Sequence, residues 1–163
     1  MALRKKQEGK LVIEQTRDLK IVRAMLSDAG MSIDGLEWPA ACYLLAYFGT
    51  EAVGVVGIEP SLDAALIRSL YVIAKMRTRG IGSDLIAAAR KAAHTRGARA
   101  LYLFSADGGD FFKRFGFVAA PVPQLLATLA AVPMVKSYRA SAAESGHELA
   151  WYLDISQDGV ILR

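Results

Sequence analysis

The segment from Leu70 to Ser83 constrains the fold more than any other part of the sequence. It reads LYVIAKMRTRGIGS, an apolar run, a basic turn with two glycines, and the start of a stretch with helical periodicity. The pattern predicts a strand that passes through a tight turn directly into a helix. Because the first turn of a helix has free N–H groups at the positive end of its dipole, such a turn is typical of a site for phosphate oxygens.

The sequence on either side of this segment predicts a mixed sheet. Three β-like runs precede or lead into it, and the short turns between them favour an antiparallel meander; they cover Cys42 to Phe48, Ala52 to Glu59 and Ala65 to Ile73. A helix is predicted from about Ile81 to Arg96, followed by a buried strand from Ala100 to Ser105. The order strand, helix, strand favours a parallel crossover. We therefore expect an α/β fold, with a central mixed sheet flanked by helices on both faces.

Shorter elements are predicted toward the two ends of the chain. A strand over Lys10 to Glu14 precedes a helix that Thr16 caps and Gly30 ends, and residues 31–40 form a loop able to move over a site. The second half contains a short helix near Gly109 to Arg114, a small strand over Phe117 to Ala119, proline-interrupted helical turns over residues 121–140, and a last strand over Leu149 to Ile155.

Length and composition favour one domain. The 163 residues suit a single unit over 1–163, in which we expect flexible ends at residues 1–8 and 158–163. The hydrophobic content of 53% suggests apolar surface for a homodimer. The charged start is not followed by an apolar segment, and no apolar run approaches the ~18 residues of a membrane span, so we expect a cytoplasmic protein without a membrane partner.

The formal net charge of +4 is unevenly distributed. Residues 24–67 contain six acidic residues and no Lys or Arg, whereas residues 75–114 contain nine basic residues and three acidic ones. This division suits a phosphate-bearing ligand in the basic half and a protonated amine near the acidic half. The basic residues gather around one short turn rather than along a stripe with exposed aromatic residues, so we expect no nucleic-acid partner.

The glycine turn itself excludes two common nucleotide sites. It lacks the Gly-Lys-Ser/Thr of a phosphate-binding loop and the Gly-x-Gly-x-x-Gly of a dinucleotide fold. Its pattern is Arg-x-x-Gly-x-Gly, in which Gly80 and Gly82 admit a ligand close to the backbone while Arg77 and Arg79 add charge-assisted contacts.

This pattern resembles the pyrophosphate-binding signature of the GCN5-related N-acetyltransferases (GNAT), which bind acetyl-coenzyme A. The Leu-x-Val strand before it and the segment FFKRFGF at 111–117, similar to the family's Phe-Tyr-x-x-x-Gly-Phe, support the resemblance over residues 10–120. Residues 53–59 and 66–70, with Phe112, are similar to the branch found in arsenic-resistance operons, from which the tail over residues 121–145 departs.

The resemblance implies the GNAT acyl-CoA N-acyltransferase fold and direct transfer, in which an amine attacks the thioester of bound acetyl-CoA. It implies that the pantetheine arm pairs with Leu70, Tyr71 and Val72, and that the backbone N–H of Val72 stabilises the thioester oxygen. The pyrophosphate is expected on the backbone of the turn and the helix start, at Arg77, Thr78, Arg79, Gly80, Ile81, Gly82 and Ser83.

The resemblance leaves the proton-transfer groups open. Many family members carry a glutamate on the strand before the motif, but Ala65 to Arg68 contains no acid. Glu59 is the nearest substitute as general base. The alternative interpretation is that Glu59 is an exposed carboxylate at a strand end or in a turn. Phe112 replaces the tyrosine that commonly protonates the leaving thiolate, so Ser105, another tyrosine or solvent would take that role.

Other side chains have two interpretations each. Arg68 either clamps a substrate carboxylate or forms a surface ion pair, and strand alternation directs Ser69 to the opposite face. Trp38 could close over the acceptor or anchor the core, and Trp151 suits the core or a dimer interface. Cys42 is expected to be a buried thiol, and the isolated His94 and His147 predict no metal site.

Three functions are consistent with these features. The leading one is acetyl-CoA-dependent N-acetylation of a small amine, such as an amino-acid-like or arsenic-containing toxic compound. The second is amino-acid N-acetylation in metabolism, which a carboxylate bound by Arg68 would favour. The third is a non-catalytic acyl-CoA-binding sensor, supported by Phe112 and by the missing strand glutamate.

Overall fold

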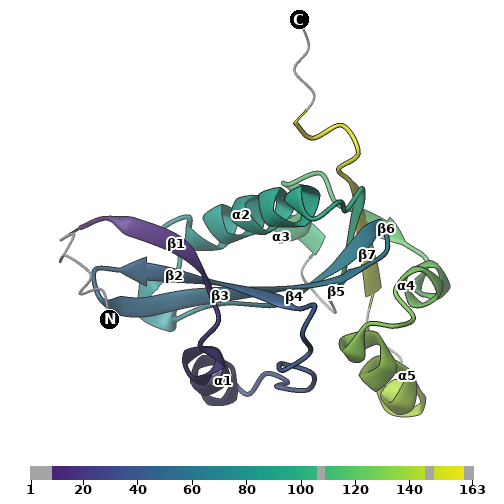
Figure 1. Ribbon diagram of the computed structural model, residues 1–163, viewed down its shortest axis with the longest axis horizontal. Helices are drawn as coiled ribbons and strands as arrows, with labels where there is room; N and C mark the ends of the chain where they lie inside the picture. Colours follow the sequence, from purple (N-terminus) through teal and green to yellow (C-terminus); the bar gives the residue numbers. More distant parts are fainter. Residues whose placement is uncertain (1–8, 106–108, 146–148, 160–163) are drawn as a thin grey trace, which may run out of the picture.

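A seven-stranded sheet forms the centre of the protein (Figure 1). The computed structural model describes residues 9–105, 109–145 and 149–159, and the strand order is β1-β2-β3-β4-β5-β7-β6. The strands are β1 (Leu11–Thr16), β2 (Cys42–Phe48), β3 (Glu51–Ser61), β4 (Ala64–Val72), β5 (Ala100–Ser105), β6 (Val118–Ala120) and β7 (Leu149–Asp154). Strands β1 to β4 are antiparallel, β4 and β5 are parallel, and β7 is antiparallel to both of its neighbours. The predicted mixed sheet with a parallel crossover is confirmed.

Helices cover both faces of the sheet, as expected (Figure 1). The helices are α1 (Leu19–Asp28), α2 (Ile81–Thr95), α3 (Gly109–Lys113), α4 (Val122–Thr128) and α5 (Pro133–Ser145), with a short 3-10 turn, η1, over Ala74–Met76. Helices α2 and α3 lie on one face, and α1 and α5 lie on the other. In the described residues, no helix has both the length and the apolar character needed to span a bilayer.

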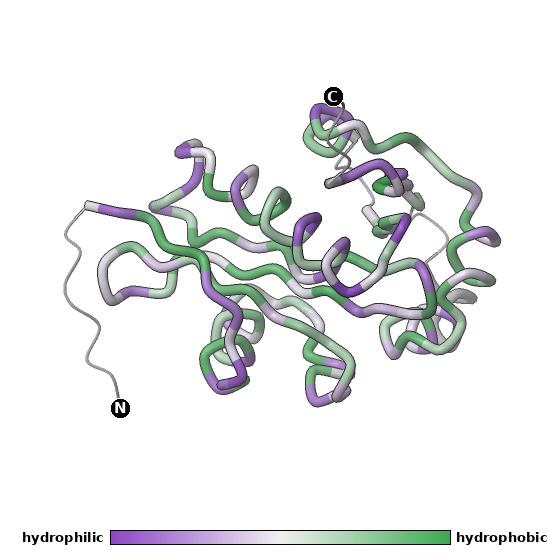
Figure 2. The backbone as a smooth tube through the Cα atoms, turned by 45° about the horizontal axis from the view of Figure 1, so that its top comes forward, coloured by the Kyte–Doolittle hydropathy of each residue, from purple (hydrophilic) through white to green (hydrophobic). Residues whose placement is uncertain are grey.

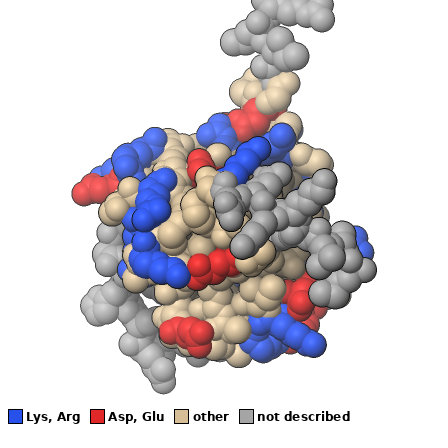
Figure 3. All heavy atoms as spheres, turned by 90° about the vertical axis from the view of Figure 1, so that its left-hand side faces the viewer, with Lys and Arg blue, Asp and Glu red and all other residues tan. Residues whose placement is uncertain are grey.

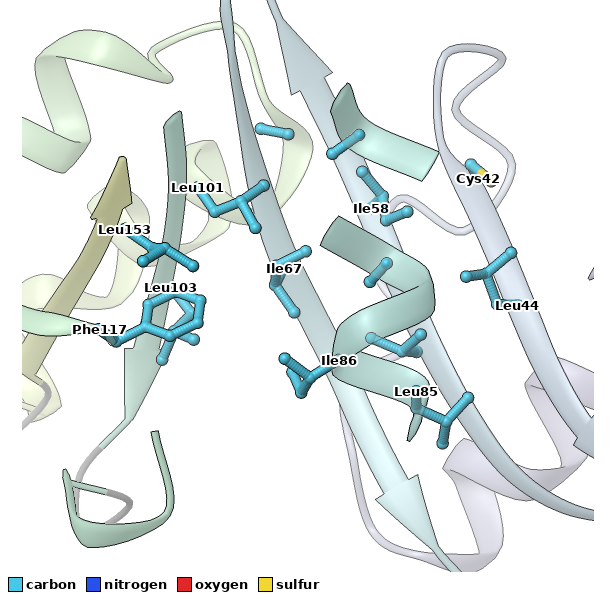
Figure 4. Close-up of a cluster of buried hydrophobic side chains, with 14 of the residues drawn as sticks. Cys42, Leu44, Ile58, Ile67, Leu85, Ile86, Leu101, Leu103, Phe117 and Leu153 are labelled. Carbon is cyan, nitrogen blue, oxygen red and sulfur yellow. The ribbon is translucent and has the colours of Figure 1, made fainter. Parts of the chain in front are cut away.

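The main core lies between α2 and the sheet. Leu85 and Ile86 of α2 pack with Ile58, Ile67 and Leu101 from three neighbouring strands (Figure 4). Figure 2 shows hydrophobic residues concentrated in the central strands. Two smaller clusters on the opposite face join α1 to β2 and β3, and α4 and α5 to β4, β5 and β7. The cluster of α4 and α5 holds these two helices beside the parallel strands β4 and β5.

Two local predictions were wrong. The cap of α1 is Asp18, whose carboxylate accepts the N–H of Lys20, because β1 extends through Thr16. The prolines of the tail begin helices instead of interrupting them: Pro121 precedes α4 and Pro133 opens α5. Proline is tolerated there because the first-turn N–H groups have no partner within the helix.

A bulge in β4 breaks the predicted alternation at Ser69. Gly57 pairs with Arg68 and Val55 with Tyr71, so two residues of β4, Ser69 and Leu70, lie opposite a single residue of β3. Ser69 has a φ of +59°, and its hydroxyl accepts a 2.9 Å hydrogen bond from Nε of Arg68. The side chains of Arg68 and Ser69 therefore lie together, and the prediction that Ser69 points to the opposite face was wrong.

The acidic stretch of the sequence does not form a uniformly negative surface. Glu37 pairs with Arg23, and Glu51 pairs with Lys75. Figure 3 shows Lys and Arg beside Asp and Glu at the end of the molecule that it faces. The segments predicted as flexible ends, residues 1–8 and most of 158–163, and His147 lie outside the described residues.

Candidate active site

Strands β4 and β5 separate partway along their length. They pair only from Ala64 to Leu66 on β4 and from Ala100 to Tyr102 on β5. Three cavities of about 600, 410 and 510 Å³ lie along the opening. The first and second share Leu70 and Phe111, and the second and third share Met31, Ile67, Arg68, Ser69 and Phe104. We call them the turn cavity, the middle cavity and the far cavity.

The turn cavity contains most of the residues predicted to bind the cofactor. It is lined by Leu70, Tyr71, Val72, Arg77, Thr78, Gly80, Ile81, Gly82 and Ser83, together with Met76, Phe111 and Arg114. Arg79 is exposed and is not among the residues that line it. The fold thus gathers the strand, the turn and the helix start of the sequence motif around one space.

The N-terminus of α2 faces the turn cavity without a side-chain cap. Gly80 is the N-cap residue, its φ of +80° suits glycine, and its carbonyl accepts the N–H of Asp84. The N–H groups of Ile81, Gly82 and Ser83 precede the first intrahelical bond and receive no cap from a side chain. Three donors and the positive end of a 15-residue helix are therefore directed at a cavity of ligand size.

Gly82 also brings α2 close to α3. A Cβ added at Gly82 would lie 3.3 Å from the ring of Phe111, closer than most carbon contacts. Because Phe111 lines the turn and middle cavities, a side chain at position 82 would displace a wall of the candidate site.

Two arginines border the turn cavity. Arg77 donates from Nε to the carbonyl of Val72 at 3.0 Å, and its guanidinium lies 5.5 Å from the ring centre of Tyr71. Arg114 lies over the ring of Phe111 at 5.2 Å. Arg114 and Phe111 were not predicted as site residues from the sequence. Their signal was the FFKRFGF segment, which follows β5 and therefore lies beside the end of the parallel strand β4.

The backbone of β4 presents donors to the opening. The N–H of Ile73 donates to the carbonyl of Val53 at 2.9 Å, on the side of β3. Because successive N–H groups of a strand point to opposite edges, the N–H of Val72 is directed away from β3, toward the side on which β5 has diverged. This direction suits the predicted role of Val72 as a donor to a thioester oxygen.

The middle cavity brings Ser105 and Phe112 together. Both line it, with Phe111 and the bulge residues Ser69 and Leu70. The ring of Phe112 contacts Phe111 edge-to-face at 5.1 Å between centroids, and it contacts Phe117 at 5.9 Å. No Asp or Glu is among the described residues that line this cavity.

Glu59 is a fully buried residue within β3, so the alternative of an exposed strand-end carboxylate was wrong. Its Oε1 accepts from Nη1 of Arg68 at 3.4 Å, while Oε2 has no hydrogen-bond partner among the described residues. Burial raises the pKa of Glu59 to about 7, against the opposing effect of the Arg68 charge and a smaller one from the Met134 N–H. Glu59 is not among the residues lining the three cavities.

Arg68 is buried as well, and the interpretation as a surface ion pair was wrong. Its Nη1 also donates to the carbonyl of Asp34 at 2.6 Å, its Nη2 donates to the carbonyl of Ser32 at 3.1 Å, and its Nε bonds Ser69. The guanidinium therefore anchors the loop over residues 31–40 to the sheet. It lies at the border of the middle and far cavities.

A tyrosine and a glycine complete the buried surroundings of this pair. A Cβ added at Gly57 would lie 2.7 Å from the ring of Tyr43 and 2.9 Å from Cγ of Arg68, so only glycine fits between them. The Tyr43 hydroxyl is buried with no hydrogen-bond partner in the described part of the chain, and burial raises its pKa to about 12.

The remaining candidate residues have structural positions. Trp151 is buried in β7, and Trp38 is partly buried against the cluster of α4 and α5. Cys42 is buried, which raises the pKa of its thiol, and His94 lies in the last turn of α2. Within the described ranges, no three His, Cys, Asp or Glu side chains come together in a way that suits a metal ion.

The sequence matches one family model, and the fold matches known structures. Residues 39–119 match the model of the acetyltransferase (GNAT) domain, which covers the meander, the turn, α2 and FFKRFGF. A comparison with curated proteins finds no match. The N-acetylglutamate synthase of Neisseria gonorrhoeae, complexed with coenzyme A and N-acetyl-glutamate, is similar with a TM-score of 0.71 and 18% identity, over 91% of this chain and 36% of that chain. The present chain thus spans about a third of that synthase.

Two further structures of similar fold are shorter. An acetyltransferase of the GNAT family from Staphylococcus aureus aligns with a TM-score of 0.66 and 15% identity, over 90% of this chain and 99% of that one. The PaiA N-acetyltransferase of Thermoplasma acidophilum, in complex with coenzyme A, aligns with a TM-score of 0.54 and 14% identity, over 82% and 68%. The chain therefore matches the acetyltransferase (GNAT) domain over residues 39–119 and has the fold of the GNAT acyl-CoA N-acyltransferases.

Proposed function

We propose that this protein is an acetyl-CoA-dependent N-acetyltransferase that acts on a small amine. The observation that carries the proposal is the uncapped N-terminus of α2, which opens into a cavity beside the free edge of β4. A ligand with a pyrophosphate and an extended amide-containing arm fits both features, since the helix start binds anions and a strand edge pairs with amides. Coenzyme A has this chemistry.

The cofactor would run from the turn cavity into the middle cavity. Its pyrophosphate would accept hydrogen bonds from the N–H groups of Ile81 to Ser83, with Arg77 and Arg114 at the border of the same space. Its pantetheine arm would follow β4 from Val72 to Leu70. The thioester would then lie near Ser105 and Phe112, and the amine would approach from the far cavity.

The transfer is written as one displacement in a ternary complex. The neutral amine nitrogen forms a bond to the thioester carbon, the carbon–sulfur bond breaks, and coenzyme A leaves as a thiolate. The N–H of Val72 stabilises the negative charge on the thioester oxygen during attack. Because no described carboxylate lines the middle cavity, we propose that water accepts the amine proton and that the Ser105 hydroxyl relays this proton, through water, to the thiolate, which is released as the thiol.

In this proposal Glu59 is a positioning residue and not a direct base. It is separated from the cavities and holds Arg68, which holds the loop over residues 31–40. We propose the same positioning role for Arg68. Its guanidinium already donates four hydrogen bonds to protein oxygens, so we do not assign it to bind a substrate carboxylate.

We expect Phe112→Tyr to raise kcat by about tenfold, because it adds a phenol to the cavity that holds Ser105. The pH–rate profile should gain an alkaline limb from that phenol. Phe115→Tyr, at a ring outside the lining of the three cavities, is the matched control and should leave the profile unchanged. A profile identical in wild type and Phe112→Tyr would show that the thiolate is protonated by another route.

A thiol-release assay with acetyl-CoA and a panel of amino acids, polyamines, arylalkylamines and arsenic-containing amines tests the activity. Thiol release that depends on an amine supports transfer. Binding of acetyl-CoA with no release across the panel would instead favour the non-catalytic sensor.

Amino-acid acetylation is the second candidate function. It is supported by the fold likeness to the gonococcal synthase, whose structure holds N-acetyl-glutamate. The arsenic-related acceptor, the cytoplasmic location and the homodimer stay predictions. Light scattering tests the dimer, for which Val118 on the edge strand β6 and Leu149 at the start of β7 are exposed apolar residues.

A further inference from the structure

The far cavity supplies information about the acceptor that the family resemblance does not. It has a volume of about 510 Å³ and joins the middle cavity along Ile67 to Ser69 and Phe104. It lies at the opposite end of the opening from the turn cavity. What this cavity implies about the acceptor rests on the proposed function, in which the acceptor occupies this space.

The walls of the far cavity are mainly apolar and include stacked rings. Phe104 of β5 lies against Tyr138 of α5, with 4.4 Å between centroids and 15° between the ring planes. Met31 and Met134 contribute flexible thioethers from the loop and from α5. Leu66 and Ile67 complete the apolar lining. Burial of a hydrocarbon or aromatic body against such a surface is favourable.

The charged groups of the far cavity do not suit a carboxylate. The cationic residue among its described lining is Arg68, whose side chain is 2% exposed and whose Nε, Nη1 and Nη2 all donate to protein oxygens. The acidic residue among that lining is Asp34, which is exposed. A bound carboxylate would therefore lose its hydration without a cationic partner and would lie near a like charge.

We infer that the acceptor is a primary amine with an apolar, ring-sized body and no carboxylate. The body packs between the Phe104–Tyr138 pair and the two methionines, and the amino group reaches toward the middle cavity. The same geometry disfavours α-amino acids, so this chain differs in acceptor class from the synthase whose fold it shares.

Matched substrates test this inference, because phenethylamine is L-phenylalanine without its carboxylate. We expect kcat/KM in the thiol-release assay to be at least about tenfold higher for phenethylamine than for L-phenylalanine. Agmatine and L-arginine form a second pair without a ring, for which we expect low activity with both. Equal or higher kcat/KM for L-phenylalanine or L-glutamate would overturn the inference.

Asp34→Asn tests the charge argument separately. It should lower the ratio of kcat/KM for phenethylamine to kcat/KM for L-phenylalanine by about fivefold. The matched control is Asp28→Asn, which changes an exposed carboxylate on α1 outside the cavity lining. A preference for phenethylamine that Asp34→Asn and Asp28→Asn alter equally would overturn the role of Asp34.

The outcomes separate this inference from the proposed function. Absence of thiol release with every amine, while acetyl-CoA binds in calorimetry, would overturn both. Release with amino acids alone would retain acetyl transfer and overturn the inferred acceptor class.

Discussion

Replacing Arg68 with Met will lower the free energy of unfolding by about 3 to 5 kcal/mol at pH 8, the cost of leaving a buried charge without its partner. Arg68 is the ion-pair partner of Glu59, whose side chain is fully buried. Methionine fills similar volume but cannot neutralise the carboxylate. It also removes the hydrogen bonds that Arg68 donates to the loop carbonyls of Ser32 and Asp34. Urea unfolding of wild type and variant measures the effect.

The pH dependence of this destabilisation tests whether the buried Glu59 carboxylate causes it. The pKa of Glu59 is raised to about 7 by burial, so the folded state binds its proton more tightly than the unfolded state does. Stability therefore falls as pH rises from about 4.5 toward 7. Without the Arg68 charge the pKa rises further, and the loss continues above pH 7. We expect the destabilisation by Arg68→Met to be about 1 kcal/mol smaller at pH 5.5 than at pH 8.

The double variant Glu59→Gln with Arg68→Met is the matched control. It removes both charges and should be more stable than Arg68→Met alone at pH 8, and its own stability should lack the fall between about pH 4.5 and 7 that Glu59 causes in wild type. If Arg68→Met lost the same stability at both pH values, and the double variant recovered none, the buried pair would not be the origin of the effect.

Ser83→Glu will weaken binding of coenzyme A by at least about 100-fold. Position 83 lies in the first turn of α2, where glutamate accepts from free backbone N–H groups and complements the helix dipole. The new carboxylate would occupy the donors assigned to the pyrophosphate and repel its charge. Calorimetric titration of wild type and variant with coenzyme A measures the dissociation constants.

The helix itself should not suffer from this substitution. An acidic residue in the first turn stabilises a helix by about 0.3 to 1 kcal/mol, so the Tm of Ser83→Glu should equal or exceed that of wild type. In Ser83→Gln, the glutamine has nearly the shape of glutamate without its charge, so this variant should weaken the binding of coenzyme A by less than about tenfold. Equal weakening by Glu and Gln would mean that size, and not competition for the anion site, governs binding.

Sequence periodicity was sufficient for most of the fold. The apolar runs of β2 and β5 were predicted with their full bounds, because buried strands between turn residues leave little ambiguity. The strand–turn–helix segment was also predicted, since glycine and arginine at fixed positions have few other uses. The start of α1 was misplaced by two residues because Thr16 and Asp18 are both good caps.

The buried pair and the bulge could not be predicted from local sequence. Glu59 and Arg68 are nine positions apart, and only the β3–β4 register brings their side chains together. The left-handed conformation of Ser69 has no sequence signal, because serine seldom adopts it. Without the bulge, Arg68 and Ser69 would face opposite sides, and the guanidinium could not bond both Ser69 and the loop.

The most direct test of the central claim is a crystal structure of the protein with coenzyme A. Our account predicts pyrophosphate oxygens within hydrogen-bond distance of the N–H groups of Gly82 and Ser83, and a pantetheine arm along β4 from Val72 to Leu70. Coenzyme A bound with its pyrophosphate on another surface, or no binding at millimolar concentration, would contradict the account.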